Sequence, residues 1–372
     1  MTDAGDPFAL ADDLGPAQVL HLSNPAHGLR AIVVVDNVAC GPAIGGARMA
    51  TDVSLAECAR LARAMTLKNA SAGLPHGGGK SVIFADPGMP AAEKEQLMRA
   101  FARAIEDVHD YIVGPDMGTD ETCMAWVHDE IGRSVGLPAA LGGIPLDEIG
   151  ATGFGVAACA EVASGFCELE LRGARVVVQG FGAVGRHAAR FLAERGAVLV
   201  AASDSAGAVI ADGGIDVERL AAIKAAGGRV ADYAGIDGAR AAGRDAVIDV
   251  ACDIWIPAAR PDVIRAENVD RLHARLVIEG ANIPITVEAE ETLRGRGVLV
   301  VPDFIANAGG VISAAVEYAG GTERAAFDRI DRQIRANTRA VLTEARERSI
   351  TPRAAANALA ERRVREAMSY RR

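Results

Sequence analysis

A short apolar run, RVVVQ at residues 175–179, leads directly into the glycine pattern GFGAVG at residues 180–185. The next residues, RHAARFLAERG, have the spacing of an amphipathic helix that ends at Gly196. A second apolar run, AVLVAASD, follows and closes with Asp204. This order predicts strand, glycine turn, helix, strand and acid, and it restricts the fold more than any other stretch of the chain.

The glycines of this pattern have separate physical tasks in a dinucleotide site. Gly180 permits the tight turn, Gly182 lets the backbone approach a pyrophosphate, and Gly185 lets the helix pack closely on the strand. Asp204 follows Gly185 by 19 residues, where a carboxylate can accept hydrogen bonds from the ribose hydroxyls. A glycine-rich turn that binds nothing would not require this acid, so we expect a bound dinucleotide.

Further apolar runs follow this unit at residues 245–251, 274–282 and 297–304. They alternate with helical stretches, which predicts an α/β fold with a Rossmann-type, doubly wound parallel sheet. Ligands bind beyond the carboxyl ends of the strands in such sheets. The segments just past those ends should therefore face the cofactor; they are residues 257–259, 280–282 and 303–310.

The first 150 residues show a different pattern. They contain strand-like stretches at 29–38 and 81–84 and helical stretches near 54–72 and 91–108. The helix near 54–72 places Leu61, Met65 and Lys68 on one face. A lysine on such a stripe is either a snorkelling side chain at the edge of the core or a functional group. Residues 323–370 are expected to be helical and to pack back on the first domain.

Charge and cysteine content narrow the class of protein. A net charge of −10 over 372 residues argues against a nucleic-acid partner, which would require a basic face. The six cysteines form no C-x-x-C pair, so no metal site is expected. The N-terminus lacks the features of a signal peptide, and no apolar run is long enough to span a membrane. We therefore expect a cytoplasmic protein with free thiols and no membrane partner.

The run SAGLPHGGGKS at residues 71–81 has the look of a phosphate-binding loop. Such a loop needs a glycine five residues before the glycine of its Gly-Lys pair. That position is Leu74, and the nearest glycine, Gly73, lies one residue too early. The three glycines before Lys80 must have another purpose.

Seven stretches occur in an order that is typical of one family. They are GPAIGGARM (41–49), MTLKNASAGLPHGGGKS (65–81), GPDMGT (114–119), ATGFGV (151–156), GFGAVG (180–185), EGAN (279–282) and PDFIANAGGVI (302–312). With them the chain resembles the amino-acid dehydrogenases that share a fold with glutamate dehydrogenase, namely the glutamate, leucine, valine and phenylalanine enzymes. In that family the glycine-rich run is a close-packed bend that delivers a lysine into the cleft between domains.

The resemblance implies roles for three charged residues. Lys80 matches the family's catalytic lysine, and Asp116 matches the aspartate that relays protons to and from the amino group. Lys68 matches the lysine that binds the α-carboxylate of the substrate, helped by the Gly45–Gly46 backbone and Asn282. Read without the resemblance, Lys80 could be a solvated loop lysine and Asp116 a turn residue that bonds its own backbone.

These roles agree with the chemistry of oxidative deamination. A hydride leaves Cα for the nicotinamide, water adds to the resulting imine, and ammonia departs. The water needs a base, and a lysine that stays protonated at neutral pH cannot act as one. Burial and a second lysine, Lys68, twelve residues earlier, would favour the neutral form of Lys80.

NAD is the expected cofactor, because Asp204 should repel a 2′-phosphate. The serines of SDSAG (203–207) could nevertheless tolerate NADP. The resemblance places Thr152 and Asn307 at the nicotinamide amide and neighbouring groups. The complete set of residues expected to contact the cofactor is Gly180, Gly182, Ala183, Val184, Gly185, Asp204, Thr152, Ala281 and Asn307.

Two positions decide the substrate side chain. Where glutamate enzymes of the family carry a lysine for the distal carboxylate, this chain has Ile44, and where they carry a serine it has Ala314. Gly114 and Val311 are also modest in size, so we expect an apolar amino acid, either branched-chain or phenylalanine. The alternatives are a glutamate dehydrogenase with an altered pocket and a non-catalytic regulator that binds NAD.

The sequence thus predicts two domains followed by C-terminal helices. Residues 1–148 would bind substrate, carry the catalytic groups and form the oligomer, and residues 149–335 would bind the dinucleotide. Residues 336–372 would return to the first domain. The family's symmetric assemblies imply a homo-oligomer whose small-molecule partners are an amino acid, its 2-oxo acid and ammonia.

Overall fold

The computed structural model describes residues 8–371, which divide into two units. Unit 1 contains the described residues up to Pro145 together with Val311–Ala326 and residues 357–371. Unit 2 contains Leu146–Gly310 and Phe327–Ala356. Residues 311–326, expected in the dinucleotide domain, thus group with the first unit, and only the last part of the C-terminal helices returns to it.

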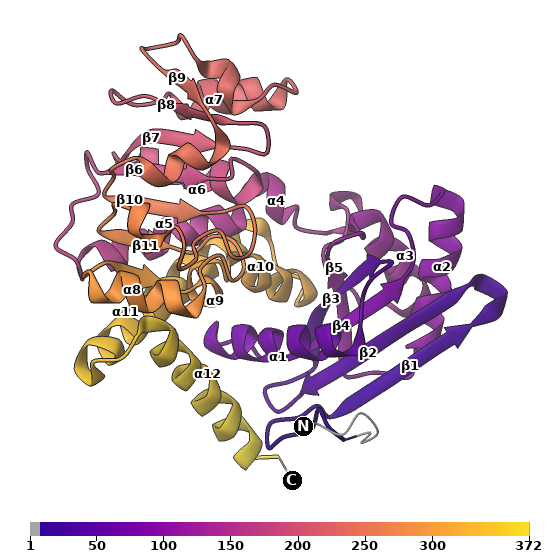
Figure 1. The fold of residues 1–372 in the computed structure, drawn as a ribbon. Coiled ribbons are helices and arrows are strands. Elements are labelled where there is room, and N and C mark those ends of the chain that lie inside the picture. The colour runs from indigo at the N-terminus through magenta and orange to yellow at the C-terminus, as the bar shows by residue number, and fades with distance from the viewer. Residues whose placement is uncertain (1–7, 372) are drawn as a thin grey trace. The chain divides into compact units, whose positions relative to one another are not determined.

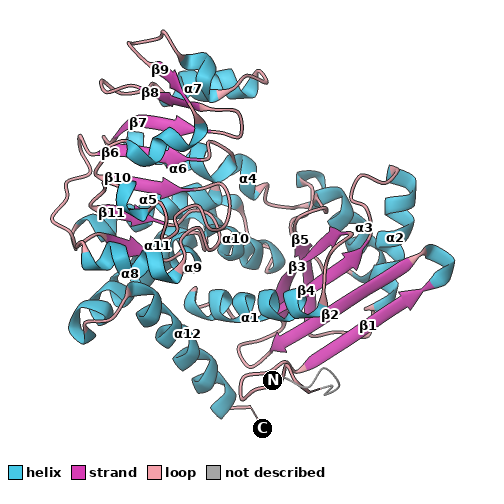
Figure 2. Ribbon diagram, in the orientation of Figure 1, coloured by secondary structure: helices cyan, strands magenta, loops and turns pink. Residues whose placement is uncertain are grey.

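Unit 1 is built on a sheet of five strands in the order β1-β2-β4-β3-β5 (Figure 2). The strands are β1 (Gln18–Asn24), β2 (Leu29–Asn37), β3 (Ala43–Ala50), β4 (Gly77–Phe84) and β5 (Tyr111–Pro115). Strands β1, β2 and β4 pair antiparallel, whereas β3 pairs parallel with both β4 and β5. The carboxyl ends of β3, β4 and β5 therefore lie at the same edge of the sheet.

Helices cover both faces of this sheet (Figure 1). They are α1 (Leu55–Ser71), α2 (Ala91–Ala104) and α3 (Glu121–Ile131), and α1 and α3 begin with the capping side chains of Ser54 and Asp120. Along β2, Val33 and Val35 pack into the core shared with α2 and α3. Ile32 and Val34 pack into a second core that contains Cys58 and Ala62 of α1. Alternation along the strand thus separates α1 from the other two helices.

The glycine-rich run of residues 77–79 is part of strand β4 and not the bend that was expected. A Cβ atom at Gly77 would lie 1.7 Å from the carbonyl oxygen of Asn37, and one at Gly78 would lie 1.9 Å from the backbone nitrogen of Thr66. At Gly79 a Cβ would lie 2.9 Å from the ring of Tyr111. The glycines are therefore required because β2, α1 and β5 approach β4 closely.

Unit 2 contains a sheet of seven strands in the order β12-β11-β10-β6-β7-β8-β9. Figure 1 labels all of them except β12. The strands are β6 (Arg175–Gln179), β7 (Val198–Ser203), β8 (Ala208–Ile210), β9 (Arg240–Ala242), β10 (Ile254–Pro257), β11 (Leu276–Ile278) and β12 (Leu299–Val301). The five strands from β12 to β7 are parallel, as expected. Strands β8 and β9 pair antiparallel, so the sheet is mixed at one edge rather than wholly parallel.

The prediction of a strand at residues 245–251 was wrong. Residues 245–251 contribute to a 3₁₀ helix, Arg244–Asp249, and the strand next to β6 is β10. Val247 and Ile248 of this helix are buried, which explains the apolar run in the sequence. The carbonyl of Val247 accepts a hydrogen bond from Nε1 of Trp255 at 3.3 Å. Burial alone does not distinguish a strand from a helical turn.

Helices surround the sheet of unit 2 and continue into the C-terminal part of the chain. They are α4 (Leu146–Ile149), α5 (Ala151–Ser164), α6 (Ala183–Glu194), α7 (Val217–Ala225), α8 (Val287–Gly295), α9 (Asp303–Ala306), α10 (Gly309–Tyr318), α11 (Glu323–Arg348) and α12 (Pro352–Ser369). The division between the units falls within α10, α11 and α12. Among the described helices, none combines the length and apolarity that a membrane span requires.

Candidate active site

Lys80 and Asp116 form an ion pair in unit 1. Lys80 lies on β4 and is 6 % exposed, and Asp116 directly follows β5. The intervening strand β3 passes beneath them at Gly46. A Cβ atom at Gly46 would lie 2.8 Å from Cβ of Asp116 and 3.2 Å from Nζ of Lys80. Only glycine leaves room for this pair, which brings together two of the residues that the sequence singled out.

The surroundings of Asp116 favour its ionised form. Burial raises the pKa of this carboxyl, but the positive charge and hydrogen bond of Lys80 outweigh burial. The backbone N–H of Met117 donates to Oδ1 at 2.7 Å, and Nε of Arg48 lies 3.4 Å from Oδ2. The net pKa is lowered, so Asp116 is a carboxylate at neutral pH and can accept a proton.

Sequence reasoning assigned no role to Arg48, which the structure places beside Asp116. Its Nη1 also donates to Oε1 of Glu57 on α1 at 2.6 Å. The residue lies within the GPAIGGARM stretch, two positions after Gly46 on β3. Because side chains two apart on a strand point to the same face, this spacing was a usable signal.

Lys68 is half-buried in the last turn of α1. Its neighbour Asn69 ties this turn to the sheet, since Nδ2 of Asn69 donates to the carbonyl of Gly77 at 2.7 Å. Gly78 and Val82 of β4 meet α1 through Thr66 and the core around Cys58. Lys80 lies two residues from both Gly78 and Val82, so its side chain projects from the same face of the sheet, the one that α1 covers. The role of Lys68 at the substrate carboxylate stays a prediction.

Ile44 and Ala314 belong to one buried apolar cluster, together with Ile112 and Val135. Ile44 is 4 % exposed and Ala314 is 9 % exposed. The two positions that the sequence singled out for substrate choice are therefore neighbours within unit 1.

Two further expected pocket residues border this cluster. Gly114 lies on β5, and a Cβ atom there would be 3.3 Å from Cγ2 of Val135. Val311 lies on α10, one turn before Ala314, and is half-buried. Glu317 on the same helix accepts hydrogen bonds at 2.7–3.1 Å from backbone N–H groups of residues 136, 137 and 144. It thereby fixes the loop that follows Val135 to α10.

The glycine turn of unit 2 has the geometry that a pyrophosphate requires. Gly180 has a positive φ of 98°, which L side chains rarely adopt. A Cβ atom at Gly185 would lie 2.0 Å from the carbonyl oxygen of Gly180, so this glycine allows helix α6 to pack on the turn. At Gly182 a Cβ atom would meet nothing within 4 Å. The space over Gly182 is open, and α6 begins beside it, at Ala183, without a side-chain cap.

The start of α6 can therefore hold a dinucleotide through backbone groups. The first N–H groups of a helix have no partner within the helix, and those of Ala183, Val184 and Gly185 are free to donate to phosphate oxygens. The carboxyl ends of β6 and β7 flank this turn, and the N–H groups of Gly180 and Phe181 donate to the carbonyl of Ser203. The residues present fit the phosphates of NAD or NADP.

Asp204 does not offer a free carboxylate at the end of β7. Its Oδ2 accepts hydrogen bonds from Nζ of Lys224 at 2.8 Å and from the N–H of Val230 at 3.0 Å. Its Oδ1 accepts from the N–H groups of Ala206 and Gly207. Burial raises the pKa of Asp204, but Lys224 and these backbone donors outweigh burial and lower it. Lys224 offsets the charge that was expected to repel a 2′-phosphate, and it lies too far along the sequence for a motif to reveal it.

Asn282 and Asn307 meet in the two loops that follow β11 and β12. Nδ2 of Asn307 donates to Oδ1 of Asn282 at 3.0 Å and lies 3.3 Å from the carbonyls of Gly280 and Ala281. Thr152 lies in the first turn of α5, and its Oγ1 is 3.2 Å from the Cβ position of Gly310. The segments predicted to face the cofactor are thus neighbours within unit 2.

Comparison with known proteins places the chain in a family. A model of the glutamate/leucine/phenylalanine/valine dehydrogenases matches residues 142–372, and a model of the dimerisation domain of these enzymes matches residues 16–133. The chain belongs to this family. It is accordingly an amino-acid dehydrogenase that acts on a CH–NH₂ group. The usual cofactor of this family is NAD or NADP.

Sequence relatives of this dehydrogenase are described as glutamate dehydrogenases. The glutamate dehydrogenase of Aeropyrum pernix is 39 % identical over 359 residues, which cover 90 % of this chain and 85 % of the relative. The NADP(+)-dependent glutamate dehydrogenase of Pyrobaculum calidifontis is 37 % identical over 362 residues, which cover 91 % of this chain and 85 % of the relative.

Solved structures share the whole architecture of this dehydrogenase. The hetero-hexameric glutamate dehydrogenase of Thermus thermophilus, in a leucine-bound form, superposes with a TM-score of 0.84 at 32 % identity and covers 96 % of this chain and 90 % of its own. The L-tryptophan dehydrogenase of Nostoc punctiforme superposes with a TM-score of 0.74 at 27 % identity and covers 96 % and 98 %. The α/β fold in two parts with C-terminal helices is thus confirmed.

Proposed function

We propose that the protein catalyses the reversible oxidative deamination of an apolar L-amino acid to its 2-oxo acid and ammonia. The observation that carries the proposal is the pair of buried Lys80 and half-buried Asp116 over the Gly46 backbone. A base and a proton acceptor are held together there with no side chain between them. In the overall reaction an amino acid, water and the oxidised cofactor give a 2-oxo acid, ammonia, the reduced cofactor and a proton.

Each residue of unit 1 has a task in this proposal. Lys68 binds the α-carboxylate of the substrate, with Asn282 as a second donor. Asp116 takes a proton from the substrate ammonium. The Lys80 ammonium of the resting ion pair releases its proton to solvent, which the positive charge of the bound substrate favours. The resulting amine then takes a proton from the water that attacks the imine carbon. Asp116 returns its proton to the departing amino group. A bound nicotinamide would supply the hydride acceptor for this reaction.

The residues of unit 2 position the cofactor in this proposal. The α6 N-terminus and Gly182 hold the pyrophosphate, while Thr152 and Asn307 hold the carboxamide end. The carboxylate of Asp204 is engaged by Lys224. We infer that both NAD and NADP are accepted, in keeping with the NADP(+)-dependent relative from Pyrobaculum calidifontis.

The apolar cluster around Ile44 supports an apolar substrate. A γ-carboxylate against Ile44 and Ala314 would lose its hydration without gaining a partner, which costs several kcal/mol. A leucine or phenyl side chain would instead extend the cluster. The L-tryptophan dehydrogenase among the solved relatives is in line with this inference.

Glutamate is the second candidate substrate, because the sequence relatives are glutamate dehydrogenases at 37–41 % identity. A panel of 2-oxoglutarate, 4-methyl-2-oxopentanoate and phenylpyruvate, each with ammonia and NADH, separates the candidates. We expect the highest kcat/KM with an apolar 2-oxo acid. The highest value with 2-oxoglutarate would overturn the apolar assignment and leave the reaction class intact.

A double substitution tests which residues set this preference. Ile44→Lys combined with Ala314→Ser supplies a cation and a hydroxyl for a distal carboxylate. We expect the ratio of kcat/KM for 2-oxoglutarate over 4-methyl-2-oxopentanoate to rise roughly 100-fold. The matched control is Ile44→Leu, which keeps the cluster apolar and should leave the ratio unchanged. An unchanged ratio in the double variant would show that the side chain binds elsewhere.

We further propose that the protein forms a homo-oligomer through unit 1, since residues 16–133 match the family's dimerisation domain. Light scattering coupled to gel filtration measures the mass directly. A monomer of 38.5 kDa at micromolar concentration would refute this part of the proposal.

A further inference from the structure

One arginine in unit 2 contacts three carboxylates. Arg353 lies in the first turn of α12. Its Nη2 is 2.6 Å from Oε2 of Glu279, its Nε is 2.6 Å from Oε2 of Glu290, and its Nη1 is 3.1 Å from Oδ1 of Asp303. The side chain of Glu279 is fully buried, and those of Glu290 and Asp303 nearly so.

Two of these carboxylates also hold the loops that follow β11 and β12. Oε2 of Glu279 accepts the backbone N–H of Asp303 at 2.9 Å. Oδ2 of Asp303 accepts the backbone N–H of Ile283 at 2.8 Å. Arg353 therefore reaches Ile283 through Asp303, using one carboxylate oxygen for the arginine and the other for the loop.

Ile283 has a backbone conformation that does not persist without support. Its φ is +43°, in the left-handed region, where a β-branched side chain clashes with its own backbone. Such a residue costs on the order of 1–3 kcal/mol, and the surrounding structure must maintain it. The side chain of Ile283 is 53 % exposed, so packing does not hold the residue in place. Two hydrogen bonds hold its backbone: its N–H donates to Oδ2 of Asp303 at 2.8 Å, and its carbonyl accepts from the N–H of Asp262 at 3.0 Å.

The strained residue directly follows Asn282, whose amide is oriented by Asn307. Nδ2 of Asn307 donates to Oδ1 of Asn282 at 3.0 Å, an assignment that follows from the hydrogen-bond network. With its oxygen engaged, the amide of Asn282 presents its NH₂ group, a donor suited to a carboxylate. Asn307 lies four residues after Asp303, and its backbone N–H donates to the carbonyl of Asp303 at 2.7 Å.

We propose that Arg353 is a positioning residue for the reaction: through Asp303 and Glu279 it holds the strained turn at Ile283 and so aims Asn282 at the substrate carboxylate. The inference rests on the proposed function, which assigns Asn282 to that carboxylate. The proposal assigns a role to a residue of α12 that lies outside the seven family stretches of the sequence.

The charge balance of the cluster fits a positioning role better than a purely stabilising one. Burial raises the pKa of Glu279 to about 8, with Asp303 and Glu290 adding to the rise and Arg353 opposing it. A buried arginine that served stability alone would not need three carboxyl groups around it, because each buried polar group costs free energy unless it is paired. Three carboxylates are needed if the arginine must fix two loops and α8 at once.

Arg353→Met tests the proposal, and Arg346→Met is the matched control. Arg346 also joins the C-terminal helices to unit 2, since its Nη2 donates to the carbonyl of Phe166 at 2.9 Å, but no contact of its side chain reaches the two loops among the described residues. We expect Arg353→Met to raise KM for the 2-oxo acid roughly 10- to 100-fold while the Kd of the reduced cofactor changes little. Arg353→Lys keeps the charge and should recover part of the loss. The control should leave KM unchanged.

Hydrogen exchange provides a readout that does not depend on catalysis. In Arg353→Met without ligands, the peptide that contains Ile283 should exchange faster, whereas peptides from β6 and α6 should not change. Equal exchange at Ile283 in the variant and the unchanged protein would overturn the proposal.

Asn282→Ala separates a failure of this inference from a failure of the proposed function. If Asn282→Ala leaves KM unchanged, the proposed role of Asn282 is wrong, and the hydrogen-exchange result alone decides whether Arg353 holds the turn. If Asn282→Ala raises KM but Arg353→Met does not, the proposed function stands and the positioning role of Arg353 is refuted.

Discussion

At the scale of single residues, the site needs both the amine of Lys80 and the carboxylate of Asp116. Lys80 is buried and Asp116 half-buried, and each neutralises the other where a lone charge would be costly. The pair also keeps the carboxylate ionised, since the charge of Lys80 lowers the pKa of Asp116 against the opposing effect of burial. The resting arrangement therefore holds a proton acceptor ready beside the lysine.

Replacing Lys80 with alanine should abolish most of the activity. Loss of the base that activates water is expected to lower kcat by roughly 10²–10⁴-fold. The glycine turn of unit 2 is untouched, so the Kd of NADH, measured by fluorescence titration, should stay the same. Lys94→Ala serves as the control, because Lys94 is a half-buried lysine on α2 whose Nζ donates to the carbonyl of Pro87. Unchanged turnover in Lys80→Ala would remove this residue from the mechanism.

At the scale of elements, the sequence predicted those features that depend on local patterns. The unit from β6 to Asp204 and the helix α1 follow from periodicity and from glycine spacing. Only the second half of strand β4 was predicted, at residues 81–84; its first half at 77–79 was not, because three glycines in succession ordinarily weaken a strand. Their reason is the close approach of Thr66, Asn37 and Tyr111, which are distant in sequence. The engagement of Asp204 by Lys224 escaped prediction for the same reason.

Two glycine-to-alanine substitutions should separate a structural glycine from a ligand-binding one. At Gly78 an added methyl group would overlap the backbone of Thr66, at 1.9 Å, and neither backbone can move easily. We expect Gly78→Ala to lower the free energy of unfolding by about 3 kcal/mol or more.

Gly182→Ala should instead leave stability within about 0.5 kcal/mol, because the methyl group meets nothing within 4 Å. The methyl group would occupy the space kept for the pyrophosphate, so the affinity for NADH should fall roughly tenfold. Urea unfolding and NADH titration on both variants measure the two effects. A Gly182→Ala variant that binds NADH normally would show that the phosphates do not approach this turn.

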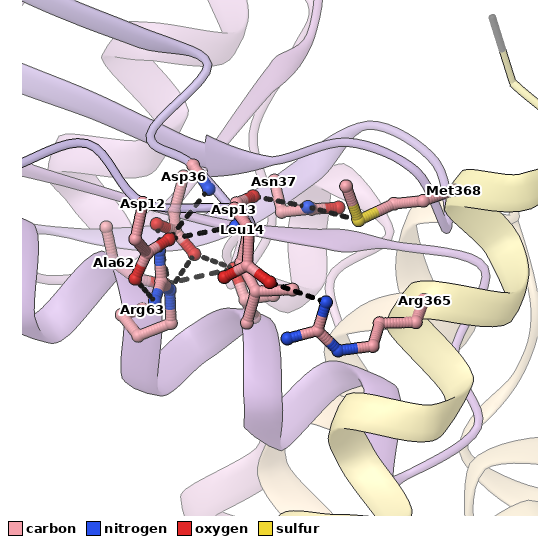
Figure 3. A network of polar contacts seen from close by, with 11 residues as sticks. Asp12, Asp13, Leu14, Asp36, Asn37, Ala62, Arg63, Arg365 and Met368 are labelled. Carbon is pink, nitrogen blue, oxygen red and sulfur yellow. Dashed lines mark hydrogen bonds and ion pairs between the residues drawn. The ribbon is translucent and has the colours of Figure 1, made fainter.

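At the scale of the whole molecule, the last residues of the chain complete the unit that the first residues begin. Ala360 and Val364 of α12 are buried in one cluster with Leu14 and with Ala70 of α1. Figure 3 shows the polar contacts around it, in which Nδ2 of Asn37 donates to the carbonyl of Leu14 at 2.6 Å and lies 3.7 Å from Sδ of Met368. These residues come from opposite ends of the chain, so the packing itself depends on no local sequence pattern.

The same segment allows packing to be compared with ion pairing on adjacent residues. Val364 is fully buried, so Val364→Ala removes apolar contacts and leaves a cavity beside Leu14 and Ala70. We expect unit 1 to lose about 2 kcal/mol of stability. Arg365 forms an exposed ion pair with Asp13 at 2.6 Å (Figure 3), and exposed pairs contribute little to stability. Arg365→Ala is therefore the matched control.

Hydrogen exchange of β2 and α1 should quicken in Val364→Ala and stay unchanged in Arg365→Ala. The reverse order would mean that charge, rather than burial, attaches the C-terminal helix to unit 1.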